Sequence, residues 1–146
     1  MTDQPAVTAE ADQFRAAAAE ARAWAKAEAT KPDSVDHAEV EGPPRWIVDF
    51  VHRHDHALVN GPRTICPHIG AHPRVAHVAH WRPGSLACTP CAEAGWLDRL
   101  ATYEQAMTCA VCGNHGTAAT MSGGRAQNGP FVLHFGVHKT CSWSQP

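Results

Sequence analysis

Large apolar side chains are scarce in this chain of 146 residues. Aromatic residues make up 7% of the sequence, and much of the 44% that counts as hydrophobic is alanine. A core built from so few bulky side chains usually needs a further source of stability, such as a disulfide or a bound metal ion. The length suits one domain, or one small domain with an appended arm.

Targeting and membrane segments are also lacking. No stretch has the apolar centre of a signal peptide, and no apolar run is long enough to span a bilayer. Acidic residues are scattered through the first 30 positions, which disfavours an organellar transit peptide. We therefore expect a cytoplasmic protein, whose six cysteines stay reduced and serve as metal ligands rather than as disulfides.

The sequence has no strongly basic region. Residues 1–60 carry six Lys or Arg and eleven Asp or Glu, a balance of −5, whereas residues 61–146 carry six and three, a balance of +3. Proteins that bind nucleic acid through its phosphates usually show a denser basic footprint. Charge thus favours a protein partner. Nucleic acid remains the alternative, if Arg74 and Arg82 on one hairpin converge with Arg125 at the tip of another.

Familiar catalytic motifs are missing as well. The chain contains no Gly-rich phosphate loop, no Gly-x-Ser-x-Gly elbow and no His-Glu-x-x-His pair. These absences remove three large classes of enzyme from consideration. We therefore expect a protein that is not an enzyme.

The strongest helix signal covers residues 10–30, which are rich in alanine. Phe14, Ala18, Ala21 and Trp24 recur on one side of this helix. That side can pack on the helix's own domain, or it can pair with another protein. The sequence leaves both possibilities open.

A polar, acidic stretch at residues 31–44 reads as a linker that ends in two prolines. A second helix is expected from Arg45 to Asn60, stopped by the Gly-Pro pair that follows it. These signals divide the chain into a helical arm with a linker, residues 1–44, and a domain made of one helix and two zinc sites, residues 45–146.

From residue 64 onward the sequence favours short strands and turns. Residues 75–88 predict a hairpin, with Pro83 and Gly84 at the centre of its turn. Further strands are expected near residues 117–121 and 131–138, around a glycine-rich loop at residues 122–129.

Two Cys-x-x-Cys pairs dominate the second half of the chain. The pairs Cys88/Cys91 and Cys109/Cys112 are separated by 17 residues, a spacing within the range of a single four-cysteine zinc site. Residues 90–107, however, predict a continuous helix about 25 Å long, whereas two thiolates on one zinc ion lie about 3.8 Å apart. Only a break at Gly95, with the chain doubling back, would allow one shared site.

Each pair therefore needs partners elsewhere. Cys66 and His68 lie upstream, and His138 and Cys141 lie downstream, so that four ligand pairs follow one another along the chain. Sequential pairing gives two Cys3His zinc sites per chain, and a cross-braced pairing is the other two-site solution. The histidine ligands have alternatives: His72 or His77 could replace His68, and His115 or His134 could replace His138.

The order of elements resembles two groups of zinc-binding folds. Residues 64–107 resemble a treble-clef finger. They contain, in order, a turn with metal ligands, a hairpin, and a helix that begins at Cys88-x-x-Cys91. Cys109-x-x-Cys112-Gly, a hairpin and a second ligand pair resemble a zinc ribbon. These likenesses imply an α+β fold: a small zinc-stabilised domain with a treble-clef-like and a zinc-ribbon-like unit, preceded by two helices. No specific family is recognised.

Closed Cys3His sites keep no position open for water or substrate, so they hold shape. We expect a non-catalytic zinc-binding module that binds a protein partner or nucleic acid. The alternative is an enzyme, because His37-Ala-Glu39 followed by Cys88-x-x-Cys91 is similar to the pattern of zinc-dependent nucleoside and nucleobase deaminases. That resemblance implies zinc on His37, Cys88 and Cys91, with Glu39 moving protons.

Overall fold

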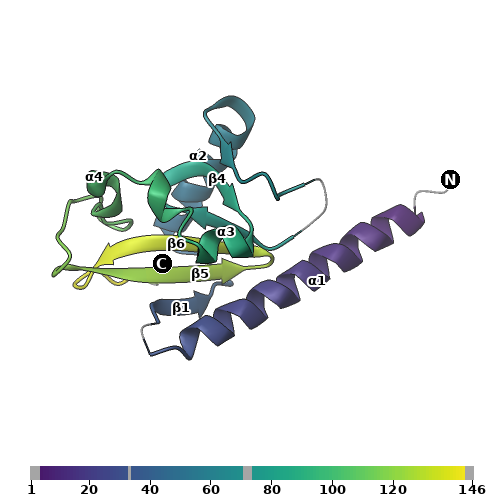
Figure 1. Ribbon diagram of the computed structural model, residues 1–146, viewed down its shortest axis with the longest axis horizontal. Coiled ribbons are helices and arrows are strands. Elements are labelled where there is room, and N and C mark those ends of the chain that lie inside the picture. Colours follow the sequence, from purple (N-terminus) through teal and green to yellow (C-terminus); the bar gives the residue numbers. More distant parts are fainter. Residues whose placement is uncertain (1–3, 33, 71–73, 144–146) are drawn as a thin grey trace.

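The computed structural model describes residues 4–32, 34–70 and 74–143, and its fold is α+β, as the sequence predicted (Figure 1). In chain order the elements are α1 (Gln4–Ala29), β1 (Asp36–Glu39), α2 (Arg45–Asn60), β2 (Thr64–Ile65), β3 (Ala76–Ala79), β4 (Arg82–Ala87), α3 (Thr89–Glu93), the 3-10 helix η1 (Asp98–Leu100), α4 (Tyr103–Ala106), β5 (Met121–Asn128) and β6 (Phe131–His138). None of the helices within these residues is both long and apolar enough to cross a membrane.

All six strands join one mixed sheet, in the order β1-β5-β6-β3-β4-β2. The hairpins β3–β4 and β5–β6 are antiparallel, and the parallel pair β3/β6 joins them edge to edge. Short parallel strands complete both edges, β1 beside β5 and β2 beside β4. The segments that resemble two separate zinc-binding units thus share one sheet.

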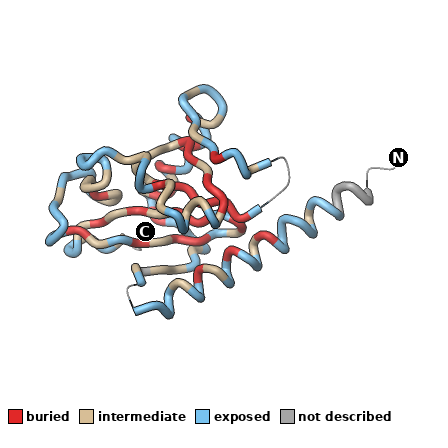
Figure 2. The backbone as a smooth tube through the Cα atoms, in the orientation of Figure 1, coloured by how far each residue is buried: buried red, intermediate tan, exposed pale blue. Residues whose placement is uncertain are grey.

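Helix α1 packs on one face of this sheet. Ala21 and Ala25 are fully buried, and Ala21 contacts Val75 and Val132. Small side chains at these positions let the helix approach the strands closely, because nothing larger than a methyl group separates the two backbones. The N-terminal part of α1 extends beyond the sheet and is largely exposed, and Phe14 there is 48% exposed (Figures 1 and 2). The buried side of α1 therefore packs on its own domain.

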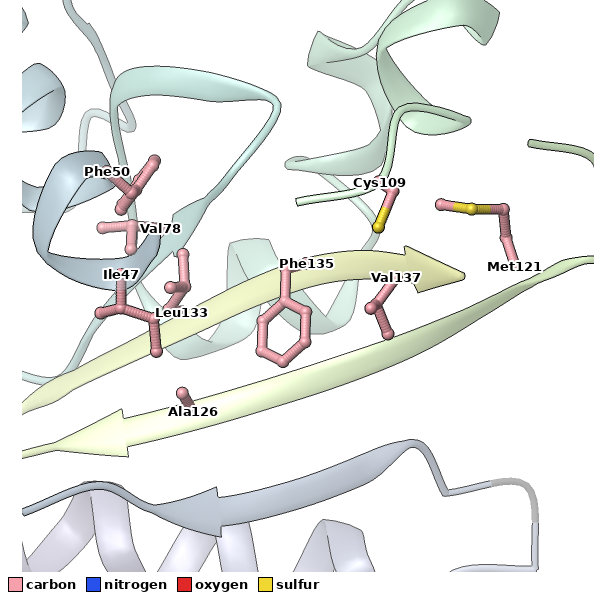
Figure 3. Close-up of a cluster of buried hydrophobic side chains, with 9 residues drawn as sticks. All are labelled: Ile47, Phe50, Val78, Cys109, Met121, Ala126, Leu133, Phe135 and Val137. Carbon is pink, nitrogen blue, oxygen red and sulfur yellow. The ribbon is translucent and has the colours of Figure 1, made fainter. Parts of the chain in front are cut away.

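Helix α2 packs on the opposite face, where the main core lies. Alternate residues of β6 point to this face, as the two-residue repeat of a strand requires. Figure 3 shows this core extending along β6 from α2 to the far end of the strand. Its buried members are Ile47, Phe50, Val78, Cys109, Met121, Ala126, Leu133, Phe135 and Val137.

The stretch expected to be a linker is part of the sheet. Strand β1 lies within it and pairs in parallel with residues 124–127 of β5. An ion pair of 3.2 Å between Arg22 and Glu39 also joins β1 to α1. The division of the chain at residue 44 stays a prediction.

The glycine-rich segment expected to be a loop is strand β5, and the segment expected before it as a strand, residues 117–121, is mostly a turn. The reason lies in packing. A Cβ atom on Gly124 would lie 2.3 Å from the ring of Phe135, so only glycine lets this aromatic ring lie flat on the strand. The glycines that indicated a loop serve here to let a ring approach.

The β3–β4 turn also differs from the prediction. It is formed by His80 and Trp81, and Pro83 and Gly84 lie inside β4. Gly84 has a φ of 85° next to an irregularity in the β3–β4 register, and its N–H donates to His54 Nδ1 over 2.8 Å. The positive φ thus belongs to a distorted strand that faces α2, and not to a type II turn.

The long helix expected over residues 90–107 does not form. Helix α3 ends at Glu93, Gly95 has a φ of 79°, and the short elements η1 and α4 follow. Thr102 and Gln105 form a capping box that starts α4 afresh. The apolar residues whose spacing predicted one helix lie in and between three short helices instead.

The contact between Gly124 and Phe135 gives a test of the packing. Gly124→Ala places a methyl group against the ring, and we expect it to lower the free energy of unfolding by about 1–3 kcal/mol. Gly42→Ala is the matched control, because a Cβ atom there meets nothing within 4 Å. Urea denaturation of the metal-loaded protein measures both variants, and equal stability of the two would contradict the close packing at Gly124.

Candidate metal centres

The first cluster consists of Cys66, His68, Cys88 and Cys91, whose donor atoms all lie within 4.8 Å of one another. His68 Nδ1 is 3.3 Å from Cys91 Sγ and 3.7 Å from Cys88 Sγ. A tetrahedral ion with Zn–S bonds near 2.3 Å and Zn–N bonds near 2.0 Å requires about 3.5 Å between sulfur and nitrogen. The donor atoms therefore fit one tetrahedral ion.

Strand pairing brings the two halves of this cluster together. Cys66 follows β2 and Cys88 follows β4, and these two strands are parallel neighbours. The N–H of Cys66 donates to the carbonyl of Leu86 over 2.9 Å, and the N–H of Cys88 donates to Cys66 Sγ over 3.3 Å. Cys91 lies in α3, a helix that begins at Thr89 with Cys88 as its N-cap.

The second cluster consists of Cys109, Cys112, His138 and Cys141, with donor atoms again within 4.8 Å of one another. His138 ends β6, and its Nδ1 is 3.2 Å from Cys112 Sγ. The turn that carries the first two cysteines closes through the N–H of Gly113, which donates to the carbonyl of Cys109 over 2.9 Å. Gly113 has a φ of 75°, a conformation that glycine adopts without strain.

A second contact orients the His138 ring. Its Nε2 lies 3.2 Å from the carbonyl oxygen of His115, so that Nε2 carries the proton and Nδ1 is left free for a metal ion. Histidine ligands are commonly fixed in this way. The sequence offered His115 only as an alternative ligand; the structure gives its backbone the role of orienting His138.

The other alternative ligands lie elsewhere. His77 Nδ1 and His134 Nε2 are 2.8 Å apart, and Trp24 of α1 packs on both rings. Neither histidine belongs to a cluster. His72 lies outside the described residues.

Sheet topology keeps the two clusters apart. Cys88 follows the end of β4, which is antiparallel to β3, while β3 runs parallel to β6. Cys88 therefore lies near the level of Val132 at the start of β6, and His138 lies at its end. Six residues of strand separate these levels, which is about 20 Å. The break at Gly95 does not bring the two Cys-x-x-Cys pairs together, although the helix expected to separate them is absent.

The thiols of each cluster differ in acidity. Burial alone would raise the pKa of Cys66, but the backbone N–H groups of Cys88 and His68 lower it to about 7. Hydrogen bonding to Cys88, burial and the nearby sulfur of Cys66 raise the pKa of Cys91 to about 11. Three thiolates cannot share such a small volume unless a cation offsets their repulsion.

The second cluster has the same pattern. Backbone N–H groups, first that of Cys112, outweigh burial and lower the pKa of Cys109 to about 7. Burial and the sulfurs of Cys109 and Cys112 raise the pKa of Cys141 to about 11. A metal ion must displace the proton of this last thiol, so metal affinity rises with pH through the neutral range.

The residues of the deaminase-like pattern are not brought together. His37 lies in the edge strand β1, four strand positions away from β4. At about 4.8 Å between neighbouring strands, this is about 19 Å. Cys88 and Cys91 cluster with Cys66 and His68 instead, and Glu39 pairs with Arg22.

Two variants test whether the side chain of His138, and not that of His115, binds the metal. His138→Ala removes one of four donors, and we expect it to weaken zinc binding at the second cluster by about tenfold or more. His115→Ala is the matched control, since it keeps the backbone carbonyl. Competition with a chromophoric zinc chelator measures both affinities. Equal weakening by the two variants would mean that the His115 imidazole takes part in metal binding.

No family model, curated protein or solved structure matches this chain. Its function is therefore derived from its own residues. These supply two clusters with the donor set of closed metal sites, and two cavities that none of the eight donor residues lines, one apolar and one polar.

Proposed function

We propose that this protein is a non-catalytic, zinc-stabilised module that binds a protein partner. The observation that carries the proposal is the pair of Cys3His clusters, each with four donors placed for one tetrahedral ion. Thiolate and imidazole donors suit zinc, and a complete set of four leaves no coordination position for water or substrate. Such an ion holds the chain in shape and performs no chemistry.

Each ion would join parts of the chain that lie far apart in the sequence. The first would join the turn after β2 to the start of α3, and the second would join the end of β6 to the turn at residues 109–112. The free energy of metal binding then contributes directly to folding. This compensates for a core that is poor in large side chains.

An apolar cavity of about 400 Å³ offers a place for a partner to bind. It lies between α1, α2 and the β5–β6 turn, and three exposed apolar side chains, one from α1, one from α2 and one from the start of β6, line it. Phe14 is 48% exposed, Val51 44% and Phe131 49%. Exposed apolar side chains around a hollow are typical of surfaces that receive an apolar anchor residue from another protein.

The arginines needed for nucleic-acid binding do not support that alternative. Arg125 lies in the middle of β5 against Trp24 of α1, and not at the tip of a hairpin. Arg82 of β4 donates to Thr64 Oγ1 of β2, and Arg74 is exposed before the start of β3, whereas Arg82 pairs with its last residue, Ala79. Their separation, together with a formal net charge of −2, favours a protein partner.

Site-specific crosslinking tests this proposal. A photoreactive benzoylphenylalanine replaces Phe131 beside the apolar cavity, and we expect ultraviolet light to trap one discrete protein in cells that express the chain. The same residue in place of Val59, which is 78% exposed on α2, is the control and should trap nothing discrete.

Two results would contradict the proposal. One is the absence of any adduct at position 131, or identical adducts at both positions. The other is tight binding of generic duplex or single-stranded DNA or RNA in a mobility shift, with a steep loss of binding as salt rises.

A further inference from the structure

A second cavity, of about 580 Å³, lies on the face of the sheet that α1 covers. Its walls come from the C-terminal half of α1, from β5 and β6, and from the segment around α3 and η1. Trp24 and Trp81 form apolar parts of the wall, and both are held in place: Trp24 Nε1 donates to Glu93 over 2.8 Å and Trp81 Nε1 donates to the carbonyl of Leu97 over 2.9 Å. The volume is that of a site for a small molecule.

Basic side chains form a row at the base of this cavity. Arg125 of β5 lies directly opposite His37 of β1 on one side and His134 of β6 on the other. His134 contacts His77 of β3, whose Nε2 is 3.0 Å from the hydroxyl of Thr89. One guanidinium and three imidazoles thus cross four neighbouring strands, and Arg125 and His134 line the cavity itself.

Arg125 has no counterion within the described residues. No carboxylate pairs with it, and its Nε is buried without a hydrogen-bond acceptor. Its guanidinium carbon lies 5.3 Å from the centre of the Trp24 ring. Two of the carboxylates that line the cavity have other partners, since Glu28 pairs with Lys31 and Glu93 accepts from Trp24. A guanidinium without a counterion is unfavourable in a partly buried position, and a carboxylate bound beside it would supply the missing charge partner.

The imidazoles beside Arg125 add no charge of their own. Burial, with His77 and then Arg125 as further causes, lowers the pKa of His134 to about 3. Burial and Arg125 lower the pKa of His77 to about 4. Both rings are therefore neutral near pH 7, and Arg125 is the one formal charge of the row.

His134 can offer a hydrogen-bond donor to a ligand that pairs with Arg125. Its Nε2 is engaged with His77, and no hydrogen bond within the described residues uses its Nδ1. If the Thr89 hydroxyl donates to His77 Nε2, then His77 donates through Nδ1 to His134 Nε2, and His134 carries its proton on Nδ1. That proton is available to an acceptor next to Arg125.

We propose that this cavity binds a small carboxylic acid with a flat apolar body. The carboxylate pairs with the guanidinium of Arg125 and accepts a hydrogen bond from His134 Nδ1, and the body packs against Trp24 and Trp81. The other charges that line the cavity favour a single carboxylate over a phosphate. Glu28 and Lys31 pair with each other, and the exposed Glu93 and Asp98 repel a multiply charged group. This site goes beyond the binding of a protein partner and uses neither metal cluster.

A matched pair of probes tests the proposal on the unaltered, zinc-loaded chain. The probes are 2-naphthoate and 2-naphthamide, which share a flat body and differ in charge. Nuclear magnetic resonance follows the Nε–H signal of Arg125 and the indole N–H signal of Trp24. We expect both signals to move and saturate with naphthoate, and the amide to bind about tenfold more weakly or worse, as loss of a charge-assisted pair implies.

Variants then assign the binding to Arg125. Arg125→Met should weaken naphthoate binding by the same factor, and Arg74→Met, which removes the same charge at an exposed position outside the cavity, should leave it unchanged. Near-ultraviolet circular dichroism shows whether Arg125→Met keeps the fold, and the two probes on the unaltered chain remain decisive if it does not.

Three results would overturn the proposal. The first is that naphthoate moves neither signal on the unaltered chain. The second is that the amide binds as well as the acid, or that Arg74→Met weakens binding as much as Arg125→Met. The third is that adenosine monophosphate binds more tightly than naphthoate, which would assign the cavity to phosphates.

Discussion

Thiolates repel one another at the distances within each cluster, and in our proposal the rest of the structure depends on a cation that offsets that repulsion. Each cluster lies where strands end: the first after β2 and β4, the second at the end of β6. Cys109 is at once a donor of the second cluster and a buried member of the main core, so metal binding and apolar packing meet in one side chain (Figure 3). Loss of either ion would therefore release one end of the sheet.

The candidate metal ligands and the second helix were the parts most open to prediction from the sequence. Cysteine is rare enough that six residues at short spacings leave few pairings, and the structure gathers the eight candidate ligands into two clusters in chain order. Helix α2 spans the predicted residues, Arg45–Asn60, because a Pro-Pro pair precedes it and Gly61-Pro62 follows it. These signals come from residues that are close together in the sequence, so predictions from them do not depend on knowing the tertiary structure.

The predictions that were wrong concern features that depend on contacts between residues far apart in the sequence. Gly124 indicated a loop, but the ring of Phe135, brought across by β6, makes glycine necessary inside a strand. The acidic stretch around β1 has no strand signal of its own and becomes a strand by pairing with β5. The row from His37 through Arg125 to His134 exists only because β1, β5 and β6 are neighbours, an order that no local pattern specifies.

Removal of the metal tests the central claim most directly. If the two clusters hold the ends of the sheet, a strong chelator at neutral pH should strip the zinc and abolish the near-ultraviolet circular dichroism of the five tryptophans. Part of the far-ultraviolet helix signal should remain, because the alanine-rich sequence of α1 favours a helix on its own. A tryptophan signal that survives complete removal of the metal would contradict the account, since the sheet would then stand without its ions.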